Sequence, residues 1–148
     1  MSTDIEIRQI NIEALPDIIN LYRVLRPDWV PPSTTEQQLK KCPAYGAYTP
    51  NNDMVGFIYS HDFAPDILEL YNIYVCRALR GKSVGSRLLQ AFEKDARYRD
   101  YNAVLLFNSD AYETAQKKIS AAPFYLKHGY QKIAMTPQTK IFFKNLAD

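Results

Sequence analysis

The first part of the chain passes from a strand-like to a helical pattern of apolar residues. "IEIRQIN", residues Ile5–Asn11, alternates apolar and polar positions, which is typical of a half-buried strand. Apolar residues then recur at helical spacing through "NIEALPDIINLYRVLR", with Asn11 as the candidate N-cap. The prolines of "RPDWVPPSTTEQ" end this helix, and a second, short helix is predicted through "EQQLKKC".

The middle of the chain predicts three strands and a longer helix. Strands Ala44–Tyr48 and Met54–Ser60 are joined by Thr49–Asp53, which carries the Pro and Asn residues that tight turns favour. Ile67–Val75 is largely apolar on both faces, so this strand is expected at the centre of a sheet. The next helix is predicted to end near Asp100 and has an apolar stripe, made of Leu88, Leu89, Phe92 and Ala96.

The last part predicts a buried strand at Ala103–Ser109, a helix and a closing hairpin. "AYETAQKKISAAPFYLKHGY" is helical in pattern except for Pro123, and Gly129 can close the helix as a C-cap. "QKIAM" and "TKIFFKNL" predict the strands of the hairpin. This order predicts an α/β (α+β) fold, with a mixed, mostly antiparallel sheet. Because no repeat, linker or boundary indicates a second domain, residues 1–148 are predicted to form one domain.

Composition and charge add limits rather than a function. With 148 residues, 47% of them apolar and 23% charged, the chain has an ordinary globular composition and enough length for a core. A net charge of +2 is too small to argue for a nucleic acid or membrane partner. Cys42 and Cys76 form neither a metal-site spacing nor a disulfide framework. Without an apolar run of about twenty residues or a leader pattern, the protein is expected to be cytoplasmic.

Candidate chemistry begins in "NIYVCRALRGKSVGSRLL", where a strand passes into a helix through a basic turn with glycines. A helix N-terminus carries unpaired N–H groups and partial positive charge, so it can bind phosphate when the preceding turn lacks bulky side chains. Gly81 and Gly85 keep this backbone open, while Arg80, Lys82 and Arg87 add positive charge. The alternative is an ordinary loop whose basic residues are solvated. The P-loop spacing and the three-glycine dinucleotide fingerprint are both absent.

The turn resembles the acyl-coenzyme A pyrophosphate loop of the GNAT superfamily of N-acetyltransferases. That family's loop has Gln or Arg, two residues, Gly, one residue and Gly or Ala, after a strand that ends near a valine. Arg80 and Gly85 match, whereas Ser83 takes the middle position where the family usually has glycine. The order of predicted elements and the later "FYLKHGY" also match. The resemblance implies the GNAT fold, a central sheet of about six to seven strands flanked by about four helices.

The resemblance implies an enzyme, an acyltransferase that moves the acetyl group of acetyl-CoA to a primary amine. Family members do so by direct attack of the amine within a ternary complex. The backbone of the strand end at Ile73, Tyr74 and Val75 would bind the pantetheine arm, much as an added strand would. The residues implied to hold the pyrophosphate are Arg80, Gly81, Lys82, Ser83, Val84, Gly85 and Ser86.

For catalysis, the resemblance implies that Tyr125 is the general acid. "AAPFYLKHGY" is similar to a family helix whose tyrosine lies near the thioester sulfur in many members. A phenol, with an ordinary pKa of about 10, is suited to protonate a thiolate. The alternative is that Tyr125 only packs on the sheet. Family members often carry an asparagine where this chain has Lys118, and Asn108 is the candidate for that cofactor contact instead.

The base candidate is Glu69, since some family members keep a glutamate at a comparable place. Strand alternation puts Glu69 on the same side as Ile73 and Val75. Burial among apolar neighbours would raise the pKa of Glu69 toward a range useful for a base. A partly exposed structural carboxylate is the alternative, and His61 and Asp62, in the predicted turn before the strand, are weaker candidates.

The acceptor is predicted only by class, as a small-molecule or peptide amine. Asp62, Asp66 and Glu69 lie close in sequence and predict a negative field that favours a cationic amine. The segment that contains Trp29 is expected to form the acceptor wall. Family members often form homodimers, and the sequence leaves the oligomeric state open.

Two other functions stay open at this point. One is a GNAT-fold sensor or regulatory module that binds acyl-CoA with little catalysis, because Ser83 and Lys118 depart from the family pattern. The other is a structural domain with a fortuitous loop. No metal site is predicted in any of the three cases.

Overall fold

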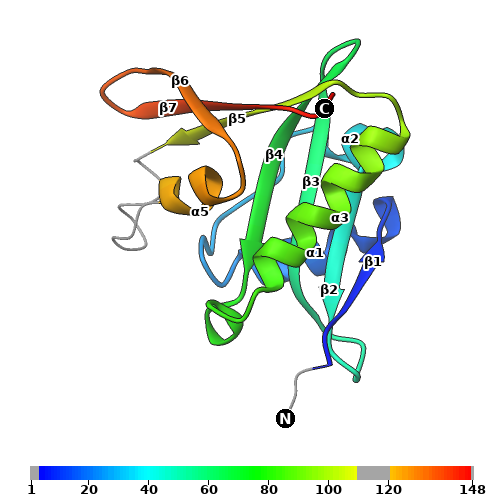
Figure 1. Cartoon of the computed structure of the whole chain (residues 1–148). Helices are drawn as coiled ribbons and strands as arrows, with labels where there is room; N and C mark the ends of the chain where they lie inside the picture. The colour runs from blue at the N-terminus through cyan, green and yellow to red at the C-terminus, as the bar shows by residue number, and fades with distance from the viewer. Residues whose placement is uncertain (1–3, 110–120, 148) are drawn as a thin grey trace.

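The structure, a computed structural model, describes residues 4–109 and 121–147 (Figure 1). Within these residues, the strands form one seven-stranded sheet in the order β1-β2-β3-β4-β5-β7-β6. The strands are β1 (Glu6–Gln9), β2 (Ala44–Tyr48), β3 (Met54–Ala64), β4 (Ile67–Val75), β5 (Ala103–Ser109), β6 (Gln131–Met135) and β7 (Thr139–Asn145). Neighbouring strands are antiparallel except β4 and β5, which are parallel. The predicted mixed, mostly antiparallel sheet is confirmed.

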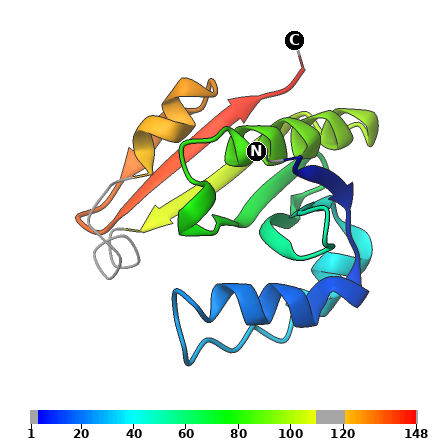
Figure 2. The ribbon, with the colours of Figure 1, turned by 90° about the horizontal axis from the view of Figure 1, so that it is seen from below.

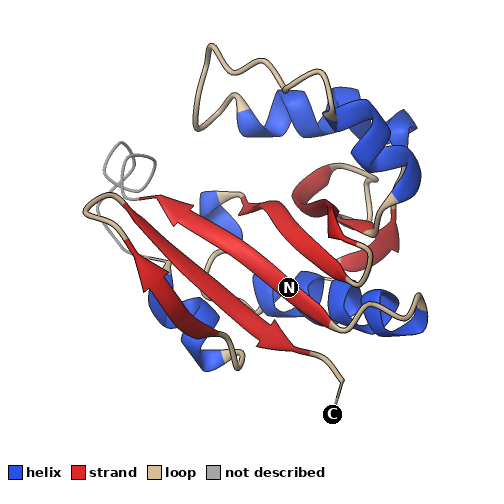
Figure 3. Cartoon of the chain, turned by 90° about the horizontal axis from the view of Figure 1, so that it is seen from above, coloured by secondary structure: helices blue, strands red, loops and turns tan. Residues whose placement is uncertain are grey.

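Helices cover both faces of the sheet, as Figures 2 and 3 show. Helices α3 (Val84–Tyr98) and α5 (Ala122–Lys127) lie on one face, which we call the α3 face. The 3-10 helix η1 (Ile12–Ala14), α1 (Leu15–Tyr22) and α2 (Thr35–Lys41) lie on the other, the α1 face. A second 3-10 helix, η2 (Arg77–Leu79), follows β4 directly. The sheet is therefore the middle layer of a three-layer arrangement.

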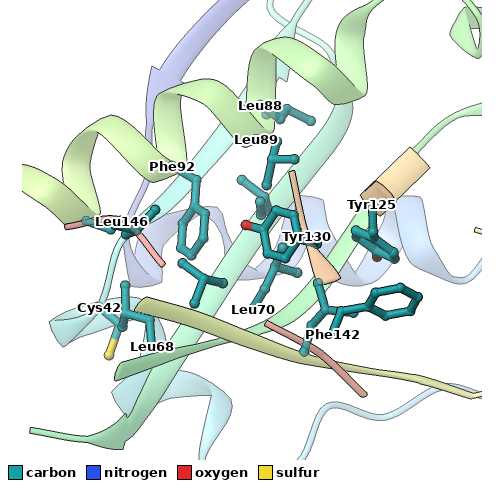
Figure 4. Close-up of a cluster of buried hydrophobic side chains, with 14 of the residues drawn as sticks. Cys42, Leu68, Leu70, Leu88, Leu89, Phe92, Tyr125, Tyr130, Phe142 and Leu146 are labelled. Carbon is teal, nitrogen blue, oxygen red and sulfur yellow. The ribbon is translucent and has the colours of Figure 1, made fainter. Parts of the chain in front are cut away.

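Each face of the sheet has its own apolar core. On the α3 face, the predicted stripe of α3 is buried against β4, where Leu88 and Phe92 pack with Leu68 and Leu70 (Figure 4). On the α1 face, the core consists of Ile18, Tyr22, Leu39, Ala44, Phe57, Tyr59 and Tyr74. Burial of these side chains on both faces explains why β3 and β4 carry near-continuous apolar runs.

Strands β2, β4 and β5 have the predicted bounds, but β3 is longer than predicted. His61 and Asp62, expected in a turn, lie in β3, where they face Glu69 and Leu68 of β4. Pairing with β4 satisfies the backbone groups of these polar residues, so their polarity does not end the strand. The predicted strand end at Ser60 is therefore wrong.

Helices lie where they were predicted within the described residues, with bounds that differ from the predicted ones. Asn11 caps η1, since its Oδ1 accepts a hydrogen bond of 2.9 Å from the N–H of Glu13. Of the predicted helix in residues 111–130, α5 is the described part, and residues 111–120, including Lys118, lie outside the described residues. Pro123 lies in the first turn of α5, where no intrahelical N–H is needed, and Gly129 follows the helix with a φ of +90°.

Strands β4 and β5 pair at one end and then separate. Ile67 faces Ala103 and Glu69 faces Leu105, and no further pairing joins the two strands within the described residues. Figure 1 shows β4 and β5 diverging from this point. The opening leaves backbone groups in the second half of β4 without a strand partner on that side, so a ligand can pair with them.

A β-bulge at Tyr71 reverses the side-chain alternation of β4. Before the bulge, Leu68 and Leu70 pack in the core of the α3 face, and after it Ile73 does so. Glu69, between the two leucines, therefore faces the α1 side. The prediction that Glu69 shares a side with Ile73 is wrong, because simple alternation takes no account of the extra residue.

Candidate functional site

The first of two cavities lies where β4 ends, between the turn before α3 and helix α5, and has a volume of about 430 Å³. Most residues of the predicted cofactor site line it: Ile73, Tyr74, Val75, Arg80, Gly81, Ser83, Gly85 and Ser86. Lys82 and Val84 are not among its lining residues, and the side chain of Val84 is buried in the core of the α3 face. The structure thus brings the strand end and the turn together, as predicted.

The turn before α3 contains two residues in the left-handed region. Gly81 has a φ of +77° and Ser83 a φ of +69°. A Cβ at Gly81 would meet no atom within 4 Å, so the backbone conformation, and not crowding, requires glycine there. Ser83 is the N-cap of α3, and its side chain makes no capping hydrogen bond. The first N–H groups of α3 therefore have no intrahelical or side-chain partner from this cap and can receive an anion.

Arg80 shapes the turn as well as adding charge. Its Nε donates a hydrogen bond of 3.0 Å to the carbonyl of Val75, and its guanidinium lies 5.4 Å from the ring centre of Tyr74. Arg87, also expected near the anion, instead donates from Nη2 to the carbonyl of Ile5 at 2.8 Å. Arg80 thus fastens the turn to β4, whereas Arg87 joins α3 to the start of the chain.

The second cavity opens on the other side of the β4–β5 separation and has a volume of about 530 Å³. Aromatic side chains from several elements line it, among them Trp29, Tyr71 and Phe107. Glu69 and Arg26 are its charged lining residues within the described part of the chain. The segment of Trp29, which the sequence predicts to form the acceptor wall, contributes to the lining of this cavity.

Glu69 is held in the second cavity by His61 from the neighbouring strand. The Nε2 of His61 lies 3.1 Å from Oε1 of Glu69, and the carboxylate side chain is only 15% exposed. Burial raises the pKa of Glu69, and the charge of His61 and its hydrogen bond act in the opposite direction. A half-buried carboxylate with a raised pKa is suited to accept and release a proton near neutral pH.

Tyr125 lies at the junction of the two cavities. It lines both of them, together with Ile73 and Ala121. The residue is only 7% exposed, and its ring packs against Phe124, Tyr130 and Phe142, with centre separations of 5.4, 6.0 and 5.6 Å. Tyr125 therefore packs as a core residue, as the alternative interpretation of its role predicts. It also lies between the two cavities.

Polar contacts fix α5 and its tyrosine against α3. Ser86 Oγ and His128 Nε2 are 2.8 Å apart, which joins the first turn of α3 to the end of α5. Deeper in the same interface, the buried carboxylate of Glu93 accepts hydrogen bonds of 2.8 Å from Tyr130 and Lys144. Because buried charges need such partners, this network orders the connection from α5 to β6 and so fixes the position of Tyr125.

Comparison with known proteins gives the same architecture. Residues 44–132, more than half of the chain, match the acetyltransferase (GNAT) domain family. The chain belongs to the GNAT superfamily. No curated protein matches it significantly. The GNAT loop and the helix of Tyr125 both lie within the matched range.

Solved structures similar to this GNAT chain extend over nearly its whole length. An aminoglycoside 6'-N-acetyltransferase complexed with coenzyme A has 18% identity, a TM-score of 0.78 and covers 95% of this chain and 97% of its own. For a GNAT acetyltransferase from Staphylococcus aureus the values are 15%, 0.75, 96% and 99%. For the PaiA N-acetyltransferase from Thermoplasma acidophilum, in complex with coenzyme A, they are 19%, 0.74, 97% and 99%. At these identities, the likeness shows the fold.

Some residues of the GNAT site lie elsewhere than predicted. Asn108, expected to contact the cofactor, lines the second cavity, and its buried Oδ1 accepts no hydrogen bond from the described residues. Asp62 accepts a hydrogen bond from Tyr101 and Asp66 one from Asn102, and neither carboxylate lines the second cavity. Of the three carboxylates predicted to make a negative field, Glu69 lines the cavity and the other two do not, because proximity in sequence does not place strand-end residues on one face.

Sequence reasoning missed Phe124, Lys127 and His128 of α5 and Tyr59 and Tyr71 of the sheet. The α5 residues lie in "FYLKHGY", so their closeness to the predicted acid was the available signal. The two tyrosines gave no local signal, because their place depends on the bulge and on packing across strands. Within the described residues, no His, Cys, Asp and Glu cluster could hold a metal ion, and no helix could cross a membrane.

Proposed function

We propose that this GNAT protein moves the acetyl group of acetyl-CoA to a primary amine by direct attack in a ternary complex. One observation carries the proposal: two cavities of different chemistry meet at Tyr125. The first offers backbone groups and a helix N-terminus, and the second offers a carboxylate with a raised pKa. A reaction of two substrates in one complex needs this kind of junction.

The first cavity fits acetyl-CoA, which supplies the acetyl thioester when it is bound. The N–H groups of α3 and the open backbone at Gly81 suit a pyrophosphate, and Lys127 adds a positive side chain to the lining. The backbone at the end of β4, from Ile73 to Val75, suits the amide-bearing arm because β5 has separated there. We assign Arg80 to the shape of the turn, through its bond to β4.

Glu69 is the proposed base. A primary amine is an ammonium at neutral pH, and it must lose a proton before its nitrogen can attack. Glu69 lines the second cavity, where its carboxylate can accept this proton directly or through water. His61 holds the carboxylate in place from the side opposite to the leucine core and links it toward solvent.

Tyr125 is the proposed acid. A tyrosine phenol, with an ordinary pKa of about 10, can donate a proton, and Tyr125 lines the cavity on each side of the junction. We assign that proton to the departing thiolate. The packing of the ring and the bonds between α3 and α5 keep the phenol at one place, which an acid near a leaving group requires.

The proposed acceptor is a small molecule. A cavity of about 530 Å³ lies within the range of ordinary small-ligand sites. Two of the similar structures are N-acetyltransferases by name, an aminoglycoside 6'-N-acetyltransferase and PaiA. These names support an amine acceptor, and the cavity chemistry of this chain determines which amine.

Two measurements on the purified protein test the proposed function. Thermal unfolding with acetyl-CoA should show a rise in Tm, because a ligand at about a hundredfold excess over its Kd adds about 2.7 kcal/mol of stability. Thiol release from acetyl-CoA should then depend on an added amine. Binding of acetyl-CoA without thiol release on any amine would favour the acyl-CoA-binding module. Ser83 is the residue that supports this alternative, because it stands in the left-handed region where the family usually has glycine. Absence of binding would refute both functions.

A further inference from the structure

We propose that the acceptor is a primary monoamine with a flat, apolar body, an arylalkylamine, rather than a polyamine or another polycation. This inference rests on the proposed function, since it names the acceptor class of the same site. It depends on the charges of the second cavity, on its aromatic walls and on the position of the base.

Charge comes first. Among the described residues that line the second cavity, Glu69 carries a negative charge and Arg26 a positive one. The other carboxylates near this strand end, Asp62 and Asp66, accept hydrogen bonds from Tyr101 and Asn102 outside the lining. One ammonium group therefore finds one carboxylate. A second ammonium would have to lose water, and the described lining residues offer it no second carboxylate.

Aromatic rings are a second feature of the described lining, beside aliphatic and polar side chains. Trp29, Tyr71 and Phe107 come from the loop after α1, from β4 and from β5, and each keeps part of its surface exposed. Tyr71 is 39% exposed and Phe107 46%, high values for apolar rings at a cavity of a folded domain. Aromatic rings attract a flat apolar group, and their faces also stabilise a cation next to them.

The rings are held in fixed positions by their neighbours. Tyr22 packs edge-on against Trp29 with ring centres 4.7 Å apart, and Tyr59 lies 5.9 Å from Tyr71. The ring of Tyr71 also lies 6.0 Å from that of His61, the partner of Glu69. The bulge thus places an aromatic wall directly beside the base. An amine separated from an aromatic ring by a short chain can put its nitrogen at Glu69 and its ring among these side chains.

The experiment compares three amines in thiol release with saturating acetyl-CoA: phenethylamine, pentylamine and cadaverine. Pentylamine and cadaverine differ by one ammonium, and phenethylamine replaces the alkyl body by a ring. We expect kcat/KM to fall from phenethylamine to pentylamine to cadaverine, by about three- to tenfold at each step. Spermidine and kanamycin extend the series to higher charge and should be poorer still.

A binding measurement makes the result independent of turnover. Trp29 is the sole tryptophan of the chain and lines the second cavity, so its fluorescence reports what occupies that cavity. With coenzyme A present, phenethylamine should change this fluorescence at a lower concentration than cadaverine does. Tyr71→Leu should raise the KM for phenethylamine about tenfold and that for pentylamine much less. Tyr98→Leu is the matched control, because Tyr98 is 86% exposed on α3 and lines neither cavity.

The outcomes separate the acceptor class from the proposed function. A best rate with cadaverine, spermidine or kanamycin overturns the acceptor class while the N-acetyltransferase function stands. Selective binding of phenethylamine without turnover on any amine supports the acceptor class and overturns the function. If phenethylamine gives no turnover and no fluorescence change, and no other amine is acetylated, both the acceptor class and the function are overturned. Equal effects of Tyr71→Leu on phenethylamine and pentylamine also count against the aromatic wall.

Discussion

The two cavities on either side of Tyr125 are built from different parts of the chain. The first is made largely of backbone: the end of β4, which β5 no longer pairs with, a turn with two left-handed residues and the start of α3. The second is made of side chains that come from α1 and the loop after it, β3, β4, β5 and α5, and meet only in the folded protein. A site built from backbone requires residues such as glycine and proline at fixed spacings, which can be recognised in a sequence. A cluster of side chains from distant segments leaves no such spacing. This difference explains why the sequence predicts the cofactor better than the acceptor.

Glu69→Gln should give the largest effect and tests the second cavity alone. The amide keeps the size of the side chain but cannot take up a proton, so turnover at neutral pH should fall about 100-fold or more. Acetyl-CoA should still raise the Tm, since Glu69 does not line the first cavity. Asp66→Asn is the matched control, because its carboxylate bonds to Asn102 outside both cavities. A loss below threefold would remove Glu69 from the mechanism.

Tyr125→Phe tests the junction and should have a smaller effect. The phenyl ring keeps the contacts with Phe124 and Phe142 but holds no proton, so kcat should fall about tenfold. The loss stays moderate because a thiolate has a low proton affinity and water can protonate it. Steady-state kinetics should show an unchanged KM for acetyl-CoA. A drop in thermal stability without a change in kcat would assign Tyr125 to packing alone.

Gly81→Val tests the first cavity through its backbone. A β-branched residue at a φ of +77° costs about 1–2 kcal/mol, so the turn should shift and the KM for acetyl-CoA should rise about tenfold. The value of kcat and the order of preferred amines should stay as they are. Gly81→Asn is the control, since asparagine tolerates the left-handed region far better than valine does. Similar losses in both variants would point to another cause than backbone strain.

His61→Leu should move the pH dependence of turnover without abolishing it. Burial raises the pKa of Glu69 and His61 lowers it, so loss of the imidazole should raise that pKa further. Because a base must be ionised, the acidic limb of kcat/KM should lie above the range of an ordinary glutamate and shift to higher pH in the variant. A limb that moves to lower pH, or that persists unchanged in Glu69→Gln, would contradict the assignment.

The fold was predictable wherever local pattern determines it. Strands β2, β4 and β5 have their predicted bounds, since apolar runs and turn residues mark both ends. The face of Glu69 was not predictable, because the bulge at Tyr71 depends on the register between β3 and β4. Asn108 was assigned to the cofactor side, and no local pattern indicates which side of the opening between β4 and β5 a residue at the end of β5 will face.

Ser83→Gly should give the smallest effect and shows how tightly the first cavity depends on its backbone. At a φ of +69°, a serine is strained by about 1 kcal/mol, which glycine relieves, while glycine makes the unfolded chain more flexible and offsets part of the gain. We expect a slightly higher midpoint of denaturant unfolding and a two- to threefold lower Kd for acetyl-CoA, about 0.4–0.7 kcal/mol. Ser83→Ala keeps the strain and lacks the hydroxyl. If Ser83→Ala weakens binding and Ser83→Gly does not strengthen it, the hydroxyl itself takes part in holding the cofactor, and the first cavity also depends on a side chain.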